Sequence, residues 1–333
     1  MLIIAELSGN HNGSLERALK LIDAAADAGA NAVKFQTYTA DTMTLDLPDG
    51  DFKITDPKSL WYGRSLYQLY QDASTPWEWH KPLLDRCHER GIVGFSSPFD
   101  ESAVDFLESL NVPYYKVASF EIVDLPLIHY IAKTKKPIII STGLASLEEI
   151  QEAVDAAKGC QKITLLKCSS TYPASAADCN LMTIPDMKRR FGVTVGLSDH
   201  TLGIGVAIAS VALGAEVIEK HITLSRDDGG VDSAFSLEPD EFRMMVNEIK
   251  KAKEALGQVS YTLSKREQES LQFRRSLYIV ADIQAGDYLT KEHIGRIRPG
   301  FGAAPKHFVT VLGKRVLRDM KRGDRLCLEN VEL

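Results

Sequence analysis

Eight short apolar segments recur through the first two thirds of the chain, and amphipathic stretches separate them. They lie at residues 2–6, 32–36, 93–96, 115–118, 138–141, 163–167, 193–196 and 217–220. Nearly continuous apolar character over so few residues is typical of parallel strands that are buried on both faces. Eight strand and helix pairs in series predict an α/β fold, the (β/α)8 TIM barrel, which typically takes ~250 residues.

The stretches between these segments have helical signals. Leu19, Ile22 and Ala25 share one face of a helix predicted over 15–28, which Gly29 ends as a C-cap. The last such stretch, 238–256, is predicted to close the barrel.

One connection, residues 37–75, is much longer than the others and carries Trp61, Tyr62, Tyr67 and Tyr70. Long loops in compact domains are usually functional. We therefore expect this loop to serve a site, with a packing flap as the alternative.

The alternation of apolar segments and amphipathic stretches ends after the predicted barrel. We assign 1–257 to the barrel and the charged polar segment 258–275 to a linker. Residues 276–333 contain two copies of the pattern D-[IM]-x-x-G-D-x-L, which begin at Asp282 and Asp319. A duplicated turn of this kind predicts a small, pseudo-symmetric, β-rich domain.

Charge and apolar content exclude several classes of protein. The net charge of −6 argues against a dedicated nucleic-acid binder. Residues 276–333 alone are basic, with 10 Lys and Arg against 7 Asp and Glu, so this domain could face an anionic ligand. No apolar run approaches the ~20 residues of a membrane span.

The first residues and the cysteines point to a cytoplasmic enzyme. A basic segment is missing at the amino terminus and Glu6 comes early, so a secretory signal is not expected. The five cysteines are odd in number and lack CxxC spacing. We expect reduced thiols rather than a disulfide framework or a zinc site.

Polar side chains gather where the eight predicted strands end. In a barrel of this kind the active site forms at the carboxyl ends of the strands and in the loops that follow. The polar residues at these positions include Glu6, Lys34, Gln36, Ser97, Lys116, Ser119, Ser141, Ser170, Tyr172, Ser198, His200, Glu219 and His221. A barrel built for stability alone does not need them, so we expect an active site at this end.

Two histidines stand at equivalent positions on adjacent predicted strands. His200 and His221 can therefore share one ligand, and with carboxylates nearby they suit a divalent ion with open coordination positions. A single histidine is more often a hydrogen-bonded structural residue, but the matched positions favour a metal pair. Asp232, in the loop after the eighth strand, either lies beside this metal or is a solvated surface acid.

Two lysines occur inside otherwise apolar strands. Burial of Lys34 or Lys116 is costly unless an anion meets it, which favours a clamp for phosphate or carboxylate groups. A Schiff base on one lysine is the competing chemistry, and ion pairs with Glu6 or Glu219 are the structural alternative. The two glutamates also suit proton transfer. Arg298, on a Gly/Pro-rich loop of the small domain, is either a bidentate cation for a site or an exposed arginine without a role.

Seven motifs resemble the nonulosonic (sialic-type) acid synthase family across essentially the whole chain. They are IAELSGNH at 4–11, VKFQT at 33–37, YKVAS at 115–119, STG at 141–143, GLSDH at 196–200, EKH at 219–221 and RPGFG at 298–302. Segment 61–80 is most similar to the pseudaminic acid branch, and Ser170 stands where the sialic acid branch commonly has asparagine. The resemblance implies a TIM barrel followed by a small SAF (type III antifreeze-like) domain over 276–333.

The resemblance also implies the chemistry. Phosphoenolpyruvate would condense with an N-acetylated amino sugar, 2,4-diacetamido-2,4,6-trideoxy-β-L-altropyranose in the pseudaminic branch, to give a nine-carbon 2-keto sugar acid and phosphate. His200 and His221 would hold Mn²⁺ or Mg²⁺, or Co²⁺. Glu6, Lys34, Lys116 and Glu219 would be catalytic; phosphoenolpyruvate would contact Lys34, Ser97, Lys116, Ser119, Ser141, Ser170 and Ser198, and the sugar Gln36, Tyr172, Asp232 and Arg298.

The family also implies a homodimer in which each SAF domain is swapped onto the partner's barrel. Three alternatives stay open. An N-acetylneuraminate or legionaminate synthase would use the same mechanism on a different sugar. A Schiff-base aldolase would use one of the lysines, and a non-catalytic carbohydrate-binding protein would not need polar residues at all eight strand ends.

Overall fold

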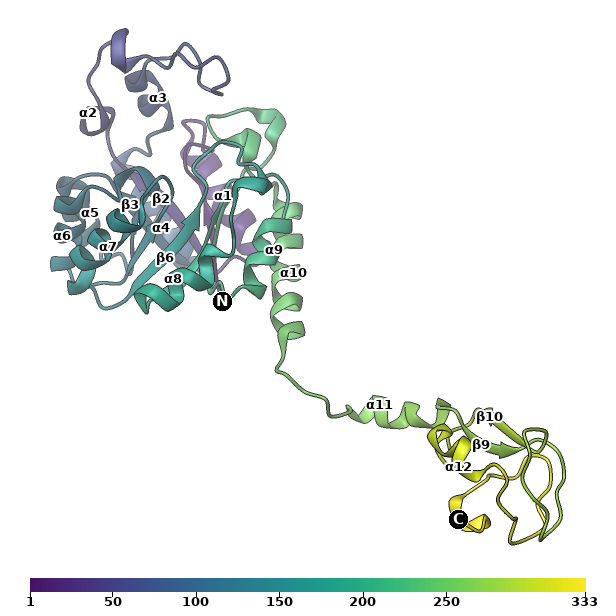
Figure 1. Cartoon of the computed structure of the whole chain (residues 1–333). Helices are drawn as coiled ribbons and strands as arrows, with labels where there is room; N and C mark the ends of the chain where they lie inside the picture. Colours follow the sequence, from purple (N-terminus) through teal and green to yellow (C-terminus); the bar gives the residue numbers. More distant parts are fainter. The chain divides into compact units, whose positions relative to one another are not determined.

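The first of two compact units is a closed barrel (Figure 1). The computed structural model describes residues 1–333, which divide into Met1–Gly257 and Gln258–Leu333. In the first unit eight parallel strands pair in chain order, and β8 closes the ring against β1. The strands are β1 (Leu2–Glu6), β2 (Ala32–Thr37), β3 (Val93–Pro98), β4 (Tyr115–Val117), β5 (Ile138–Ser141), β6 (Ile163–Cys168), β7 (Thr194–Asp199) and β8 (Val217–His221). The predicted TIM barrel is confirmed.

Helices cover the outside of the barrel, and caps that the sequence supplies mark several of their starts. They are α1 (Leu15–Asp27), α4 (His80–Glu89), α5 (Glu101–Ser109), α6 (Leu125–Lys133), α7 (Leu147–Ala156), α8 (Thr183–Phe191), α9 (Gly205–Ala212) and α10 (Pro239–Leu256). Two further helices, α2 (Ala40–Met43) and α3 (Leu66–Ala73), lie in the connection after β2. Ser14 and Ser146 cap α1 and α7, because each side chain accepts a hydrogen bond from a free amide of the first turn. None of the helices is long and apolar enough to cross a membrane.

Alternation along the strands divides the core into two layers. Odd-numbered residues of β1, such as Ile3 and Ala5, pack with the helices in the larger apolar cluster. Ile4, the even-numbered residue between them, belongs to a separate cluster inside the ring, together with Ala32, Phe95, Ile139, Leu166 and Val217. The interior is therefore a packed plug, and only the level above it, toward the carboxyl ends, is free to hold polar groups.

Several strands run further than the apolar pattern predicts. β7 was expected to end at Gly196, but its ladder with β8 continues through Ser198 and Asp199. Backbone pairing does not depend on side-chain polarity, so the strand extends into the polar level. The polar residues are consequently fixed by the sheet itself and not by flexible loops.

The long connection after β2, residues 38–75, is called the insertion below. It contains α2 and α3 and forms a lobe beside the barrel end in Figure 1. Lys53 and Ser65 form a β-bridge within it, and the Tyr67 hydroxyl donates a hydrogen bond to Asp41 at 3.2 Å. The insertion is therefore an internally braced element.

The second unit contains α11 (Lys265–Glu269), β9 (Ser276–Ile279), β10 (Ile294–Ile297) and α12 (Phe308–Val311). The short helix α11 lies in the segment that the sequence suggested as a linker. Strands β9 and β10 pair antiparallel over Ser276–Ile279 and Ile294–Ile297. The second unit has an apolar core of its own, which includes Leu277, Leu289, Met320 and Leu326.

The two sequence repeats of this unit meet across an approximate two-fold axis. Ile283 and Met320 exchange both backbone hydrogen bonds at 2.9 Å. The Asp319 carboxylate accepts from the Ala285 amide at 2.8 Å. In the other half, the Asp282 carboxylate accepts from the Arg322 amide at 2.7 Å. The predicted pseudo-symmetry is confirmed.

Candidate active site

A cavity of about 420 Å³ lies at the carboxyl ends of the barrel strands. Many of the residues that the sequence predicted for the site line it, and they come from strand ends all round the ring. They are Glu6, Lys34, Gln36, Lys116, Ser119, Ser141, Tyr172, Ser198, His200, Glu219, His221 and Asp232. The structure thus gathers in one place side chains that are more than two hundred residues apart in the chain.

Strand alternation decides which side chains reach this cavity. Glu219 and His221 line it, whereas Lys220 between them points to the other face of β8. There Lys220 is fully buried and forms a 2.7 Å ion pair with Asp199 of β7. A charged residue at a strand end is therefore part of the cavity only if its side chain lies on the inner face of the strand.

Two carboxylates and two ammonium groups share the cavity floor. Lys34 Nζ lies 2.8 Å from Glu6 Oε2 and 3.6 Å from Glu219 Oε1, and Gln36 donates to Glu6 Oε1 at 3.0 Å. Burial raises the pKa of Glu6 to about 7, although Lys34 opposes the shift. Burial acts in the same direction on Glu219, but Lys116 and Lys34 outweigh it and hold the pKa of that carboxyl below its ordinary value.

Lys116 is a buried cation without a close carboxylate. Only 1% of it is exposed, and its Nζ donates to Ser141 Oγ at 2.7 Å and to the Val117 carbonyl at 2.9 Å. Its nearest carboxylate, Glu219, is 3.9 Å away. Burial accordingly lowers the pKa of Lys116. An anion in the cavity would supply the missing charge, which favours the clamp over a purely structural ion pair.

The two predicted metal ligands stand side by side. The rings of His200 and His221 have centroids 5.3 Å apart. His200 Nδ1 donates to the Ser169 carbonyl at 3.1 Å, and His221 Nδ1 lies 3.2 Å from Ser8 Oγ. Fixing Nδ1 in this way leaves Nε2 of each ring for a ligand, the usual arrangement of metal-binding histidines.

Protein side chains alone do not complete a metal site. No three His, Cys, Asp or Glu side chains are grouped so that they could hold a metal ion. Burial, reinforced by the nearby His200, keeps the pKa of His221 well below its ordinary value, so its ring is neutral as a ligand must be. The pair fits a site whose other positions are filled by water and substrate oxygens.

Tyr172 and Asp232 bound the cavity near the histidines. The Tyr172 ring lies 4.5 Å from that of His200 and 5.2 Å from that of Phe235. Burial raises the pKa of Asp232 against the opposing effect of the Ser8 hydroxyl. Asp232 is thus a half-buried group that lines the cavity and not the solvated surface acid that was its alternative.

Comparison with known proteins places this arrangement in a family. Residues 21–261 match the NeuB family, and residues 274–331 match the SAF domain. The chain belongs to the NeuB family. The family resemblance seen in the sequence motifs is confirmed.

Relatives of this NeuB-family chain include the pseudaminic acid synthase of Campylobacter jejuni, 45% identical over 97% of this chain and 94% of the relative. The pseudaminic acid synthase of Helicobacter pylori is 42% identical over 99% and 97%. Among solved structures, the N-acetylneuraminic acid synthetase of Leptospira borgpetersenii has a TM-score of 0.71 and 34% identity. It covers 82% of this chain and 90% of its own.

Three predicted residues of the NeuB-family chain lie outside the cavity wall. Ser97 is fully buried, does not line the cavity, and accepts a hydrogen bond from Lys34 Nζ at 3.2 Å. Ser170 is half-buried, and its Oγ lies 3.5 Å from Cys168 Sγ. Arg298 belongs to the second unit, where it is exposed in the loop after β10.

Gly143 explains the STG motif at the end of β5. A Cβ atom at this position would lie 2.0 Å from Ser170 Oγ and 2.7 Å from Ser119 Oγ. The absence of a side chain lets the Gly143 amide donate to Ser119 Oγ at 3.2 Å. Glycine therefore brings two hydroxyl groups and a backbone amide together beside Lys116.

Glu121 is a site residue that the sequence analysis did not select. It follows β4, lines the cavity, and its Oε2 is buried without a hydrogen-bond partner. Burial raises its pKa to about 7 despite Lys116 nearby. Its position in the sequence indicated this role, because Glu121 comes shortly after the predicted strand 115–118, whose carboxyl end already supplied the candidate Ser119.

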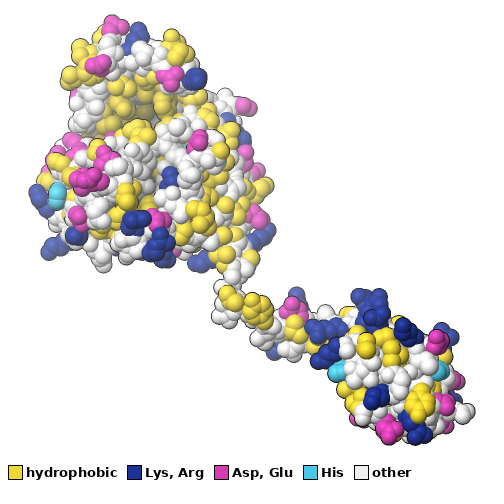
Figure 2. Space-filling view, viewed as in Figure 1, with side chains coloured by type: hydrophobic (Ala, Val, Ile, Leu, Met, Phe, Trp, Pro, Cys, Tyr) yellow, Lys and Arg dark blue, Asp and Glu magenta, His cyan; other side chains and the backbone are white.

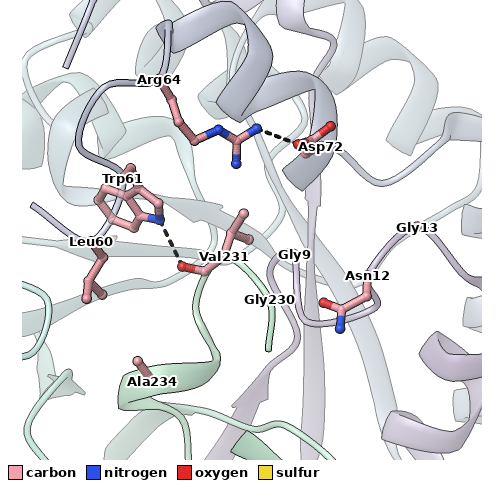
Figure 3. A pocket seen from close by; sticks show the side chains of 10 residues that line it. All are labelled: Gly9, Asn12, Gly13, Leu60, Trp61, Arg64, Asp72, Gly230, Val231 and Ala234. Carbon is pink, nitrogen blue, oxygen red and sulfur yellow. Dashed lines mark hydrogen bonds and ion pairs between the residues drawn. The ribbon is translucent and has the colours of Figure 1, made fainter. Parts of the chain in front are cut away.

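The insertion, the long aromatic loop that the sequence analysis expected to serve a site, supplies further residues of the cavity. Trp61 lines the cavity, and its Nε1 donates to the Val231 carbonyl at 2.9 Å (Figure 3). On the far side of this contact lies a second cavity of about 560 Å³, which Gly9, Asn12, Arg64 and other residues line. Trp61 and Val231 separate the two cavities.

Proposed function

We propose that this chain condenses phosphoenolpyruvate with the open aldehyde form of 2,4-diacetamido-2,4,6-trideoxy-β-L-altropyranose, giving pseudaminic acid and phosphate. The single observation that carries the proposal is the cavity floor, where two buried lysines face the paired histidines. The pseudaminic acid synthases of C. jejuni and H. pylori, similar over nearly the full chain, support this choice of sugar.

Phosphoenolpyruvate supplies the close anion that Lys116 lacks, whereas Lys34, already 2.8 Å from Glu6, would be shared between Glu6 and the substrate. Its phosphate and carboxylate would take charge-assisted hydrogen bonds from both ammonium groups and from the hydroxyls of Ser119, Ser141 and Ser198. Ser97 would act indirectly, by orienting Lys34, with which it is hydrogen-bonded. Ser170 would also act indirectly, through Ser119, because both hydroxyl groups lie beside Gly143.

His200 and His221 would hold the divalent ion, Mn²⁺ or Mg²⁺, through their Nε2 atoms. When bound there, such an ion supplies Lewis acidity toward the sugar aldehyde. Full activity of a chelated preparation without any divalent ion would refute this part of the proposal.

The two glutamates of the floor would divide the proton transfers. C3 of phosphoenolpyruvate attacks the aldehyde carbon, water adds at C2, and the tetrahedral intermediate expels phosphate by C–O cleavage. Glu6 is the better proton donor because burial raises its pKa to about 7. Glu219 stands between two ammonium groups that favour its ionised form, so it would accept the proton of the attacking water.

Gln36, Tyr172 and Asp232 line the same cavity and would contact the sugar.

The reaction would take place in the cytoplasm, since all five cysteines are free, as in a reducing compartment.

The homodimer is the second part of the proposal. Arg298 is exposed and makes no ion pair within its own unit, and large apolar side chains stand exposed after β4, β5 and β7, at Phe120, Leu144 and Leu202. A swapped SAF domain would cover those side chains and bring Arg298 to the partner's sugar. Mixing a Lys116→Met chain with an Arg298→Ala chain should then restore activity, because one site of the mixed dimer is intact. Two inactive variants that stay inactive when mixed would contradict the swap.

A product assay tests the reaction. Phosphate release and mass spectrometry should show a 2-keto acid with the trideoxy sugar, and much less with its legionaminic-series analogue or with N-acetylmannosamine. A preference for N-acetylmannosamine would refute the proposed sugar substrate but not the proposed mechanism. A borohydride-trapped adduct on Lys34 or Lys116 would replace the mechanism with an aldolase. Phosphate release only when sugar is added would exclude a protein that merely binds carbohydrate.

A further inference from the structure

The cavity has two unlike walls. Its floor is charged, but the wall opposite is apolar and consists of Met43, Ile54, Leu66, Leu69, Phe99 and Phe120, which we call the roof. Four of these six side chains come from the insertion. Figure 2 shows hydrophobic side chains around the hollow between the insertion and the body of the barrel.

The roof is held in place by contacts that do not involve a ligand. Ile54 exchanges backbone hydrogen bonds at 2.9 Å with Arg64 and Gly63. Tyr38 packs edge-on against Phe99 at 5.1 Å and against Tyr70 at 5.9 Å. Trp61 ties the insertion to the loop after β8 through Val231. A braced wall can discriminate between ligands by shape and polarity, which a mobile loop cannot do.

The direction of the sugar follows from the chemistry of the floor. The proposed reaction needs the aldehyde at the histidine pair, beside Lys34 and Glu219. The opposite end of the open chain, which carries C6, must then extend away from the strand ends and toward the roof. A hydroxyl at C6 would lose hydrogen bonds to water where it meets these six apolar side chains, whereas a methyl group would lose none.

From this geometry we infer that the roof binds the methyl-bearing C6 end of the sugar and selects 6-deoxy sugars against their 6-hydroxy counterparts. The inference rests on the proposed function for the orientation of the sugar. It assigns a role to the insertion, namely to distinguish the deoxygenation state of the substrate.

Reduced, open-chain sugars test the inference without catalysis. The alditol of 2,4-diacetamido-2,4,6-trideoxyaltrose and its 6-hydroxy counterpart differ by one oxygen and cannot condense. Calorimetry in the presence of phosphoenolpyruvate and Mn²⁺ should show about tenfold or greater preference of the full-length protein for the 6-deoxy compound, as expected for one methyl group in an apolar pocket.

Variants of the roof locate the preference. Ile54→Thr keeps the β-branch but is one heavy atom smaller, Leu66→Asn keeps the size of the side chain, and each introduces a polar group into the roof. Each should reduce the preference several-fold, mainly by improved binding of the 6-hydroxy alditol. Leu45→Asn is the matched control, because Leu45 lies in the same insertion, is 60% exposed and lines neither cavity.

Three results would overturn the inference: equal binding of the two alditols, binding of neither, or a preference that Leu45→Asn changes as much as Ile54→Thr does. If Leu66→Asn does not fold, the β-branched variant Ile54→Thr decides alone. Absence of phosphate release from phosphoenolpyruvate with every aldehyde sugar would refute the proposed function, yet a tenfold alditol preference could still be found. The two failures are therefore distinguishable.

Discussion

Lys116 and Lys220 are both buried on strands of one barrel, but their surroundings differ. Lys220 points away from the cavity and donates to Asp199 Oδ2 at 2.7 Å and to the Thr201 carbonyl at 2.6 Å. The other oxygen of Asp199 accepts two hydrogen bonds from Thr201, at 2.9 and 2.7 Å. Every polar group of this outer pair is satisfied within the protein.

The inner cluster around Lys116 is incomplete by comparison. Lys116 has no carboxylate closer than 3.9 Å, and Glu219 Oε2 and Glu121 Oε2 are buried without hydrogen-bond partners. Groups left unsatisfied in this way cost stability and are retained where a ligand completes them. Two charged regions that look alike in the sequence thus differ in the structure: the outer pair is satisfied within the protein, and the inner cluster keeps buried polar atoms without protein partners.

The largest effect is expected from Lys116→Met. Removal of this cation should lower kcat/KM by roughly 10³-fold, the usual cost of a lost group that stabilises charge in the transition state. The melting temperature should stay the same or rise, because a buried charge without a close carboxylate is removed. Phosphate release and thermal unfolding measure the two effects. A loss of activity below tenfold would contradict the comparison.

The matched change in the outer pair, Lys220→Met, should have the opposite outcome. Asp199 would remain buried without its cation, so the free energy of unfolding should fall by about 3–5 kcal/mol. The activity of the folded fraction should change less than tenfold. Denaturant unfolding checks this, and the double variant Lys220→Met/Asp199→Leu should recover most of the loss. If Lys220→Met is as stable as the parent, the pair is not structural.

Glu121→Gln sharpens the comparison through pH. Burial raises the pKa of Glu121 to about 7, above its unfolded value of 4.5, so the folded chain holds a proton that the unfolded chain releases. Parent stability should therefore fall as pH rises from 4.5 to 7. At pH 8 Glu121→Gln should be more stable than the parent, on the order of 2 kcal/mol, and the gain should fade toward pH 4.5. Melting curves at the two pH values decide, and a gain independent of pH would exclude ionisation as its cause.

The smallest effects are expected from single hydroxyl groups. Ser97→Ala removes an acceptor of Lys34, which should cost about 1 kcal/mol and lower kcat/KM about fivefold to tenfold. Thr201→Val removes a donor to Asp199 and should cost a similar free energy of unfolding with unchanged kcat/KM. Steady-state kinetics and denaturant unfolding, measured on both variants, distinguish the loss of activity in Ser97→Ala from the loss of stability alone in Thr201→Val. The comparison fails if both variants lose activity equally.

The sequence predicts the barrel and much of the floor because both depend on local pattern. Short apolar runs locate the strands, and the rule that strand ends form the site selects residues such as Lys34, Lys116 and His200. The same rule cannot separate Glu219 from Lys220, since the face that a residue takes depends on where the strand starts. The structure resolves this through the register of β7 and β8.

The roof and the second cavity are less accessible to sequence reasoning. Met43, Ile54 and Leu66 lie in a segment without strand periodicity, and their common wall arises from tertiary contacts such as that between Trp61 and Val231. Ser97 was expected on the cavity wall, yet it does not line the cavity and accepts a hydrogen bond from Lys34 instead. Whether a buried side chain reaches the cavity surface depends on how its neighbours pack, which the sequence pattern does not contain.

The reciprocal bonds of the small unit have a consequence for how it can come apart. Asp282 caps the turn of the second repeat, and Asp319 caps the turn of the first. Each repeat thus completes a backbone amide in the turn of the other, so loss of one half leaves that amide of the other half unpaired. We therefore expect the two halves of this unit to melt together, as one cooperative element.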